Sequence, residues 1–182
     1  MRILLIIPLI IFAISCEEVE NSNNDGTGEA KEQTAASVFE ELENLHKELL
    51  YEDGATNGLK AADLYAQSIQ FLNSFPNDSL RMVVMEYARA AATGSGRLKN
   101  ADTVLKMMID EFPNHPLRPE KMSLRAFTLW QLGDITASTK IYNQIMKDYP
   151  ESEWSRDAEG SLRMNQLNTD GGALPDYFER PK

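Results

Sequence analysis

The 182-residue sequence has one cysteine, Cys16, and only two histidines, His46 and His115. A single cysteine cannot close a disulfide within the chain, and isolated histidines do not make the donor cluster that a metal site requires. Positive charge is also scarce, because 18 Lys and Arg stand against 28 Asp and Glu, for a formal net charge of -10. We therefore expect neither nucleic acid nor an anionic lipid surface as partner, since both bind through basic patches.

Catalytic patterns are lacking as well. Glu40, Glu41 and Glu43 lie close together on one predicted helix, where a solvated acidic face explains them better than paired acid-base chemistry. The glycine-rich stretch 94–97 follows a predicted helix rather than a strand, so a hairpin turn explains it better than a phosphate-binding loop. Without an assembled nucleophile and base, the sequence indicates a protein that is not an enzyme and that needs no cofactor.

The chain also lacks a long hydrophobic run. The apolar stretch from Ile3 to Ile14 follows Arg2 and is interrupted by Pro8. A membrane-spanning helix needs about 20 apolar residues, so this stretch is typical of a targeting signal. We predict a signal peptide over residues 1–15 and an acidic, flexible tether over residues 16–34, which begins at Cys16. An ordinary secretory signal, for which Cys16 is incidental, and an uncleaved anchor are the alternatives to a signal that is removed immediately before Cys16.

What the sequence does contain is a repeat. The pairs Phe75-Pro76, Phe112-Pro113 and Tyr149-Pro150 recur every 37 residues. Between them, equivalent positions carry similar residues, among them the pairs Leu80 and Leu117, Arg81 and Arg118, and Gly96 and Gly133. A period of this length is typical of stacked helical hairpins, in which each proline ends a helix. The repeat therefore predicts an array of hairpins joined at aromatic-proline turns.

Apolar spacing divides the array into seven helices and no sheet. We predict helices over residues 37–51 and 59–75, two hairpins between successive proline turns, and a final helix that contains Trp154 and Ala158. The residues predicted to face inward from helix 59–75 are Ala62, Ala66, Ile69 and Leu72. The expected fold is all-α: an α-solenoid of about three hairpins plus a C-terminal capping helix, over residues 35–168. The tail 169–182 carries Leu174, Tyr177 and Phe178, and one hypothesis is that it docks back on the helices.

The stretches Asn114-His115-Pro116, Leu132-Gly133-Asp134 and 148–154 resemble tetratricopeptide repeats, strongly over residues 75–163. Arg89 stands where such repeats usually have a small residue, and Ser138 stands where they usually have alanine. The residues 13–16 resemble the lipobox of bacterial lipoproteins, which implies that Cys16 carries a fatty acyl chain such as palmitate. Together these features resemble small tetratricopeptide lipoproteins of Bacteroidota and, more distantly, the tetratricopeptide lipoprotein of the outer-membrane β-barrel assembly machinery.

This resemblance implies an outer-membrane lipid-anchored protein of the cell envelope, facing either the periplasm or the cell surface. The acidic residues after Cys16 also resemble a surface-export signal, although a solvated spacer explains them equally well. The leading hypothesis is an adaptor or scaffold that binds a protein or peptide partner. A narrower version is an accessory role in outer-membrane assembly. A small-ligand or glycan-binding surface lipoprotein is the alternative.

Five basic residues are the candidate binding site. In proteins that this chain resembles, the first helix of each hairpin lines a groove. There the basic side chains would bind carboxylates of a partner. The five residues are Arg81, Arg89, Arg118, Lys121 and Arg125. The alternative is that these side chains pair with Glu86 and Glu120 of the chain itself. Trp130 and Trp154 are expected in the core, with a role as interface anchors as the alternative.

Overall fold

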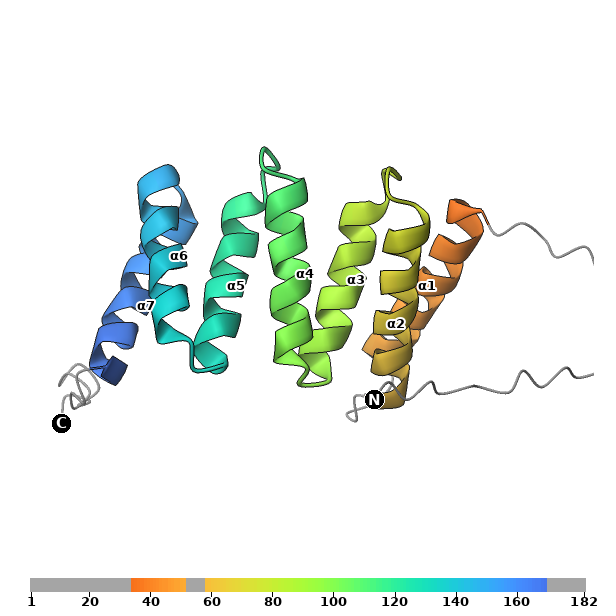
Figure 1. The fold of residues 1–182 in the computed structure, drawn as a ribbon, viewed down its shortest axis with the longest axis horizontal. Coiled ribbons are helices and arrows are strands. Elements are labelled where there is room, and N and C mark those ends of the chain that lie inside the picture. Colours follow the sequence, from red (N-terminus) through yellow and green to blue (C-terminus); the bar gives the residue numbers. More distant parts are fainter. Residues whose placement is uncertain (1–33, 52–57, 170–182) are drawn as a thin grey trace, which may run out of the picture. The chain divides into compact units, whose positions relative to one another are not determined.

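The computed structural model describes residues 34–51 and 58–169, and this part of the chain is helical without any strand. Each helix packs against the next one in the chain, and neighbouring helices run in opposite directions (Figure 1). The predicted all-α array of helical hairpins with one additional helix is therefore confirmed. The helices are α1 (Ala35–Tyr51), α2 (Gly58–Ser74), α3 (Arg81–Gly94), α4 (Leu98–Glu111), α5 (Arg118–Gln131), α6 (Ile135–Asp148) and α7 (Glu153–Thr169).

Several predicted segments lie outside the described residues. They are the signal peptide 1–15, the tether as far as residue 33 with its lipidation site Cys16, most of the linker between the first two helices, and the tail from residue 170. Among the described helices, none combines the length and the apolar character that crossing a membrane requires.

The aromatic-proline turns repeat with the same hydrogen bonds. In each turn, the carbonyl of the aromatic residue accepts a hydrogen bond from the backbone N–H of the residue three positions later. The carbonyl of that second residue accepts a hydrogen bond from the backbone N–H of a third residue, three positions further on. The three sets are Phe75–Asp78–Arg81, Phe112–His115–Arg118 and Tyr149–Ser152–Ser155. Because each following proline lacks an amide hydrogen, the preceding helix cannot continue. The predicted end of a helix at each of these pairs is confirmed.

Gly96 and Gly133 close the first helix of the two central hairpins in the same way. Their φ angles are +70° and +82°, in the left-handed region that other residues rarely adopt. Each glycine N–H donates to the carbonyl three residues earlier, and the next residue's N–H donates to the carbonyl five residues earlier. This pair of bonds is a Schellman motif, which satisfies the last carbonyls of the helix and turns the chain into its partner.

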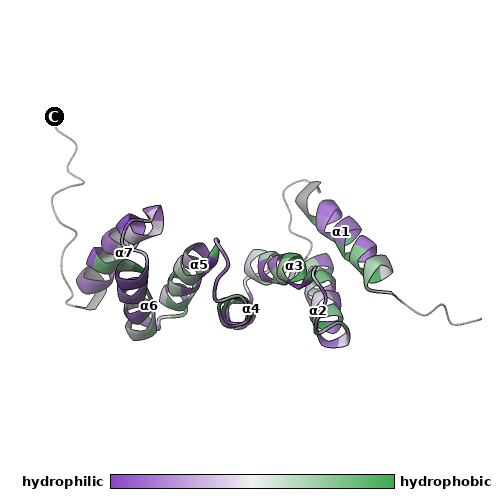
Figure 2. Ribbon diagram, turned by 90° about the horizontal axis from the view of Figure 1, so that it is seen from above, coloured by the Kyte–Doolittle hydropathy of each residue, from purple (hydrophilic) through white to green (hydrophobic). Residues whose placement is uncertain are grey.

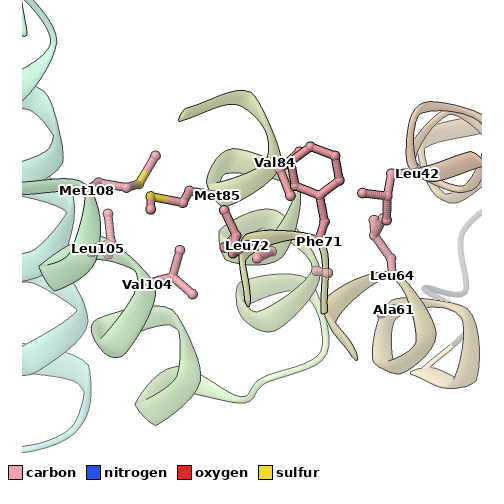
Figure 3. Close-up of a cluster of buried hydrophobic side chains, with 12 residues drawn as sticks. Leu42, Ala61, Leu64, Phe71, Leu72, Val84, Met85, Val104, Leu105 and Met108 are labelled. Atoms are coloured by element: carbon pink, nitrogen blue, oxygen red, sulfur yellow. The ribbon is translucent and has the colours of Figure 1, made fainter. Parts of the chain in front are cut away.

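Hydrophobic residues lie mainly on the sides of the helices that face their neighbours (Figure 2). One cluster joins α1 to α4, and Figure 3 shows Leu42, Leu64 and Phe71 at its α1–α2 end and Met85 and Met108 at its α3–α4 end. Burial of each such side chain stabilises the fold by about 1.5–3 kcal/mol. A second cluster joins the end of α4 to α5, α6 and α7: Ile109, Met122, Ala126, Tyr142, Ile145 and Ala158.

The inward face of α2 differs from the prediction, although Leu72 is buried as predicted and Ile69 packs partly buried against the core. Ala66 is exposed and Ala62 is only partly buried, whereas the buried residues are Ala61, Leu64, Ser68, Phe71 and Leu72. The predicted period is correct, but the helix is rotated by about one residue, or about 100°. Leu64 and Phe71 bury more apolar area than the two alanines do, so this rotation is favoured by the hydrophobic effect.

Helix α7 is fastened to α6 by a buried polar contact. The Asn165 side-chain amide, only 3% exposed, donates from Nδ2 to Ser138 Oγ at 3.2 Å and to Thr139 Oγ1 at 3.1 Å. Ser138 is fully buried, and the equivalent residue of the preceding hairpin is Ala101. The serine that departs from the tetratricopeptide pattern thus accepts a hydrogen bond from the last helix.

Candidate functional site

Arg81 and Arg118, two of the five candidate binding residues, bond to the hairpin before their own. Arg81 Nη1 donates to the Leu72 carbonyl oxygen at 2.6 Å, and its guanidinium also contacts both Glu111 carboxylate oxygens at 2.8–3.1 Å. Arg118 donates to the Ile109 carbonyl oxygen at 3.4 Å and to the Tyr149 hydroxyl at 2.8 Å. Both arginines therefore satisfy carbonyls at the end of the preceding helix.

Lys121 lies in an ion-pair network between α3 and α5. Its side chain is 6% exposed, and its ammonium contacts Glu86 of α3 as well as Glu120 at 2.9 Å. Arg89 Nε donates to the same Glu86 at 2.6 Å. Burial alone would raise the pKa of Glu86, but the hydrogen bonds and positive charges of Lys121 and Arg89 outweigh it and lower that pKa. Glu86 is therefore held as a carboxylate between two cations.

Arg125 forms a separate ion pair with α4, because its Nε donates to Asp102 Oδ1 at 2.8 Å. Lys121, in contrast, extends between helices that do not approach closely, since the α-carbons of α3 and α5 stay more than 8 Å apart in the described chain. Helices α5 and α7, in contrast, do come close, and α5 carries buried Ala126 at the position equivalent to Arg89. Arg89 thus replaces a small residue where the two helices are separated by charged side chains.

All five candidate binding residues therefore have polar partners within the chain. The pairs with Glu86 and Glu120, which the sequence offered as the alternative to partner binding, are both present. The sequence therefore anticipated the pairs with Glu86 and Glu120. It did not reveal their role between hairpins, which depends on acceptors contributed by other helices.

An apolar pocket of about 190 Å³ lies between the last three helices. It is lined by Phe127, Trp130, Tyr142, Ser161, Met164 and Asn165. The rings of Phe127 and Trp130 are stacked with centroids 5.7 Å apart and planes inclined by 16°. Phe127 is 49% exposed and Met164 is 43% exposed, so the apolar wall continues onto the surface. Burial raises the pKa of Tyr142, although a hydrogen bond with Ser161 opposes this effect.

The prediction that both tryptophans belong to the core needs refinement. Trp154 packs against the second hydrophobic cluster, but Trp130 lines the pocket and stacks on an exposed aromatic ring. The sequence did hold a signal for this pocket. Phe127 and Trp130 stand at the repeat positions that Ala90 and Thr93 occupy in the preceding hairpin, so large aromatic residues replace small ones there.

Neither histidine belongs to a cluster of metal donors in the described chain. His46 stacks on the Tyr87 ring at a centroid distance of 4.3 Å, and its buried Nδ1 has no hydrogen-bond partner among the described residues. Burial lowers the pKa of His46, which favours the neutral ring. His115 accepts a bond from the Leu117 N–H in a proline turn. Within residues 34–51 and 58–169, no group of three or more His, Cys, Asp or Glu is placed to hold a metal ion.

The second hollow is wider and more polar. It has a volume of about 560 Å³ and lies along α1 and α2, where Glu41 contributes a charged group to its lining. Gln67, Gln70 and Ser74 supply its other polar groups.

No family model matches the sequence, and no curated protein is significantly similar to it.

Proposed function

We propose that this protein is a lipid-anchored adaptor of the cell envelope, which binds a protein or peptide partner through the first helices of its hairpins. Cys16 would carry the acyl anchor, and the acidic segment after it would hold the helices near the membrane. The proposed location in the cell envelope rests on the resemblance of the sequence to tetratricopeptide lipoproteins. An accessory role in outer-membrane assembly is its narrower form and rests on that analogy alone.

One observation carries the binding part of the proposal. Successive first helices expose apolar residues, with Val83 of α3 40% exposed and Phe127 of α5 49% exposed. Stacked hairpins repeat such a face along the array, which provides an extended surface for a polypeptide. A few buried anchors near the centre of an interface, aromatic ones above all, supply most of its binding energy. The paired cations support this surface by holding the hairpins in register, and they are not its main contacts.

Replacing Arg118, Lys121 and Arg125 together by alanine would directly test the sequence-based prediction that these cations bind the partner. Because these residues join helices, that triple variant should also lose stability, so reduced partner capture would be ambiguous. A sharper experiment places a photo-crosslinking amino acid at Val83 or Phe127 in the native cell, with Lys106 of α4 and Lys140 of α6 as exposed controls.

The proposal predicts that the same protein is captured from Val83 and Phe127 but not from the two lysine positions. Failure to recover a reproducible partner from either apolar position would contradict it. A partner captured equally well from all four positions would indicate nonspecific proximity rather than this surface.

Binding of a small ligand or glycan is the second candidate. The stacked Phe127 and Trp130 rings beside the pocket favour it, because aromatic faces offer large, rigid contact areas to a ligand. A thermal-shift screen against sugars tests this candidate, with Phe127→Ala as the control variant. A rise in melting temperature that disappears in the control would favour this candidate over the adaptor.

A further inference from the structure

The apolar pocket at the C-terminal end of the array remains open in the described part of the chain. Its exposed wall consists of Phe127 on α5 and Met164 on α7, with Trp130 beside them. Most hydrophobic residues of the array are covered by a neighbouring helix, but no described helix follows α7. Exposed apolar surface that is joined to a pocket is characteristic of a binding site rather than of a solvated end.

The size of the pocket limits what can occupy it. A cavity of about 150 Å³ lined by apolar side chains accepts a benzene ring. The volume of about 190 Å³ therefore suits a single aromatic side chain. The lining residues that carry polar groups are Tyr142, Ser161 and Asn165, and none of the lining residues is Asp, Glu, Lys or Arg, so the site has little charge with which to select an ionic ligand.

The chain itself supplies aromatic side chains close to this position. Helix α7 lines the pocket with Ser161, Met164 and Asn165, and it ends at Thr169. Tyr177 and Phe178 follow only eight and nine residues later, after the pair Gly171-Gly172.

The distance along the chain is sufficient. Eight extended residues span up to about 26–29 Å. The return path along α7 from Thr169 to Ser161 is about 12 Å at 1.5 Å per residue. Two successive glycines tolerate the backbone angles of a sharp reversal. One ring of the tail can therefore reach the pocket with several residues left for the turn.

We propose that the pocket formed by Phe127, Trp130 and Met164 binds the chain's own tail, with the ring of Tyr177 or Phe178 inserted and Leu174 covering the adjacent surface. The tail then completes the array by covering the apolar face that the last helix leaves open. Because it lies against Phe127, it also competes with any polypeptide that binds there. The inference itself does not depend on the adaptor function, since it concerns the purified chain.

Tryptophan fluorescence tests this docking in the full chain. Trp154→Phe leaves Trp130 as the single tryptophan, and Tyr177→Ala with Phe178→Ala removes both rings of the tail. We expect a red shift of the Trp130 emission and a larger acrylamide quenching constant in this variant. The matched control replaces Glu179 and Arg180 of the same segment by alanine and should leave both values unchanged. Identical emission and quenching with and without the two rings would overturn the proposal.

A second measurement does not depend on replacing Trp154. A photo-crosslinking amino acid at position 178 should form bonds within one chain to α5 or α7, which mass spectrometry locates near Phe127 or Met164. Crosslinks that join two chains would identify a second copy as the occupant and would contradict the proposal. Crosslinks to residues elsewhere on the array would contradict it as well.

Discussion

Arg81 and Arg118 stand 37 residues apart, and each donates a hydrogen bond to the backbone carbonyl nine residues before it. Each bond joins the start of one hairpin to the end of the preceding helix, across an aromatic-proline turn. The second partner differs, because Arg81 reaches the Glu111 carboxylate whereas Arg118 reaches the Tyr149 hydroxyl. The repeat therefore contains a recurring arginine-to-carbonyl hydrogen bond as well as a pattern of apolar residues. The two arginines should differ in how much they stabilise the fold.

We expect Arg81→Ala to lower the free energy of unfolding by about 2–3 kcal/mol, because it removes charge-assisted hydrogen bonds to a carboxylate and a carbonyl. Arg118→Ala should cost less, about 1 kcal/mol, because its Tyr149 and Ile109 partners are neutral. Urea denaturation followed by circular dichroism measures both. Lys106→Ala is the control, because its ion pair with Asp110 is exposed and should be worth less than about 1 kcal/mol. Equal midpoints for Arg81→Ala and the control would contradict this assignment.

The Lys121–Glu86 pair should respond differently to single and double replacement. Lys121→Met leaves Glu86 with Arg89 as its remaining cation in this network, and we expect a loss of about 2 kcal/mol. Combining it with Glu86→Leu should recover part of that loss, because an apolar pair needs no compensating charge. A double-mutant cycle in urea measures the coupling energy. Additive effects of the two replacements would show that the pair does not connect α3 to α5 energetically.

The stacked ring of His46 predicts a pH-dependent stability. Burial lowers its pKa below the ordinary 6.5, so the unfolded chain binds the proton more readily than the folded one. Stability is then highest above about pH 6.5 and falls as the pH drops from 6.5 toward the folded-state pKa. Neighbouring charges are Glu43 and Lys47, which pair with each other at 3.0 Å. Glu86 does not interfere, because its lowered pKa acts only below its ordinary 4.5.

The comparison that isolates His46 uses His46→Phe. We expect the urea midpoint of the unmodified protein to fall between pH 7.5 and pH 5.5, and the midpoint of the variant to change less. Phenylalanine keeps the stack on Tyr87 and cannot bind a proton, so packing is largely preserved. The same pH dependence in both proteins would assign the effect to other groups.

The repeat made most of the helical architecture predictable, because proline turns and left-handed glycines act locally. Helix phase was less certain. In α2, Ala62 and Ala66 follow the same period as Leu64 and Phe71, and only packing against α1 and α3 decides which set is buried. The roles of Arg89 and Ser138 were harder still, since each depends on a partner that the repeat pattern does not specify. Sequence marked both positions as unusual and offered Glu86 as a partner for the cations, but the Asn165 partner of Ser138 is visible only in three dimensions.

The predicted acyl anchor concerns a part of the chain outside the described residues and has a direct test. Cys16→Ser should abolish incorporation of labelled palmitate and move the protein from the membrane fraction to the soluble fraction. The physical reason is that, without acyl chains, this acidic protein has little attraction to an anionic lipid surface. Lys106→Ala serves again as a control for general effects of substitution. Membrane association that survives without the cysteine would exclude lipidation as the anchor.

Gly133 and Gly160 differ in backbone conformation, so the same substitution by alanine should affect stability in opposite directions at the two positions. Gly133 has φ +82°, so alanine there would be strained even though a Cβ atom would meet no neighbour within 4 Å. We expect Gly133→Ala to cost about 1 kcal/mol or more, because left-handed backbone disfavours a side chain. Gly160 lies within α7, and its Cβ position is equally open. Gly160→Ala should therefore stabilise the protein by about 0.5–1 kcal/mol, since alanine favours helix more than glycine does. Opposite shifts of the urea midpoint would confirm that backbone angle decides the sign, whereas two shifts in the same direction would contradict the Schellman closure at Gly133.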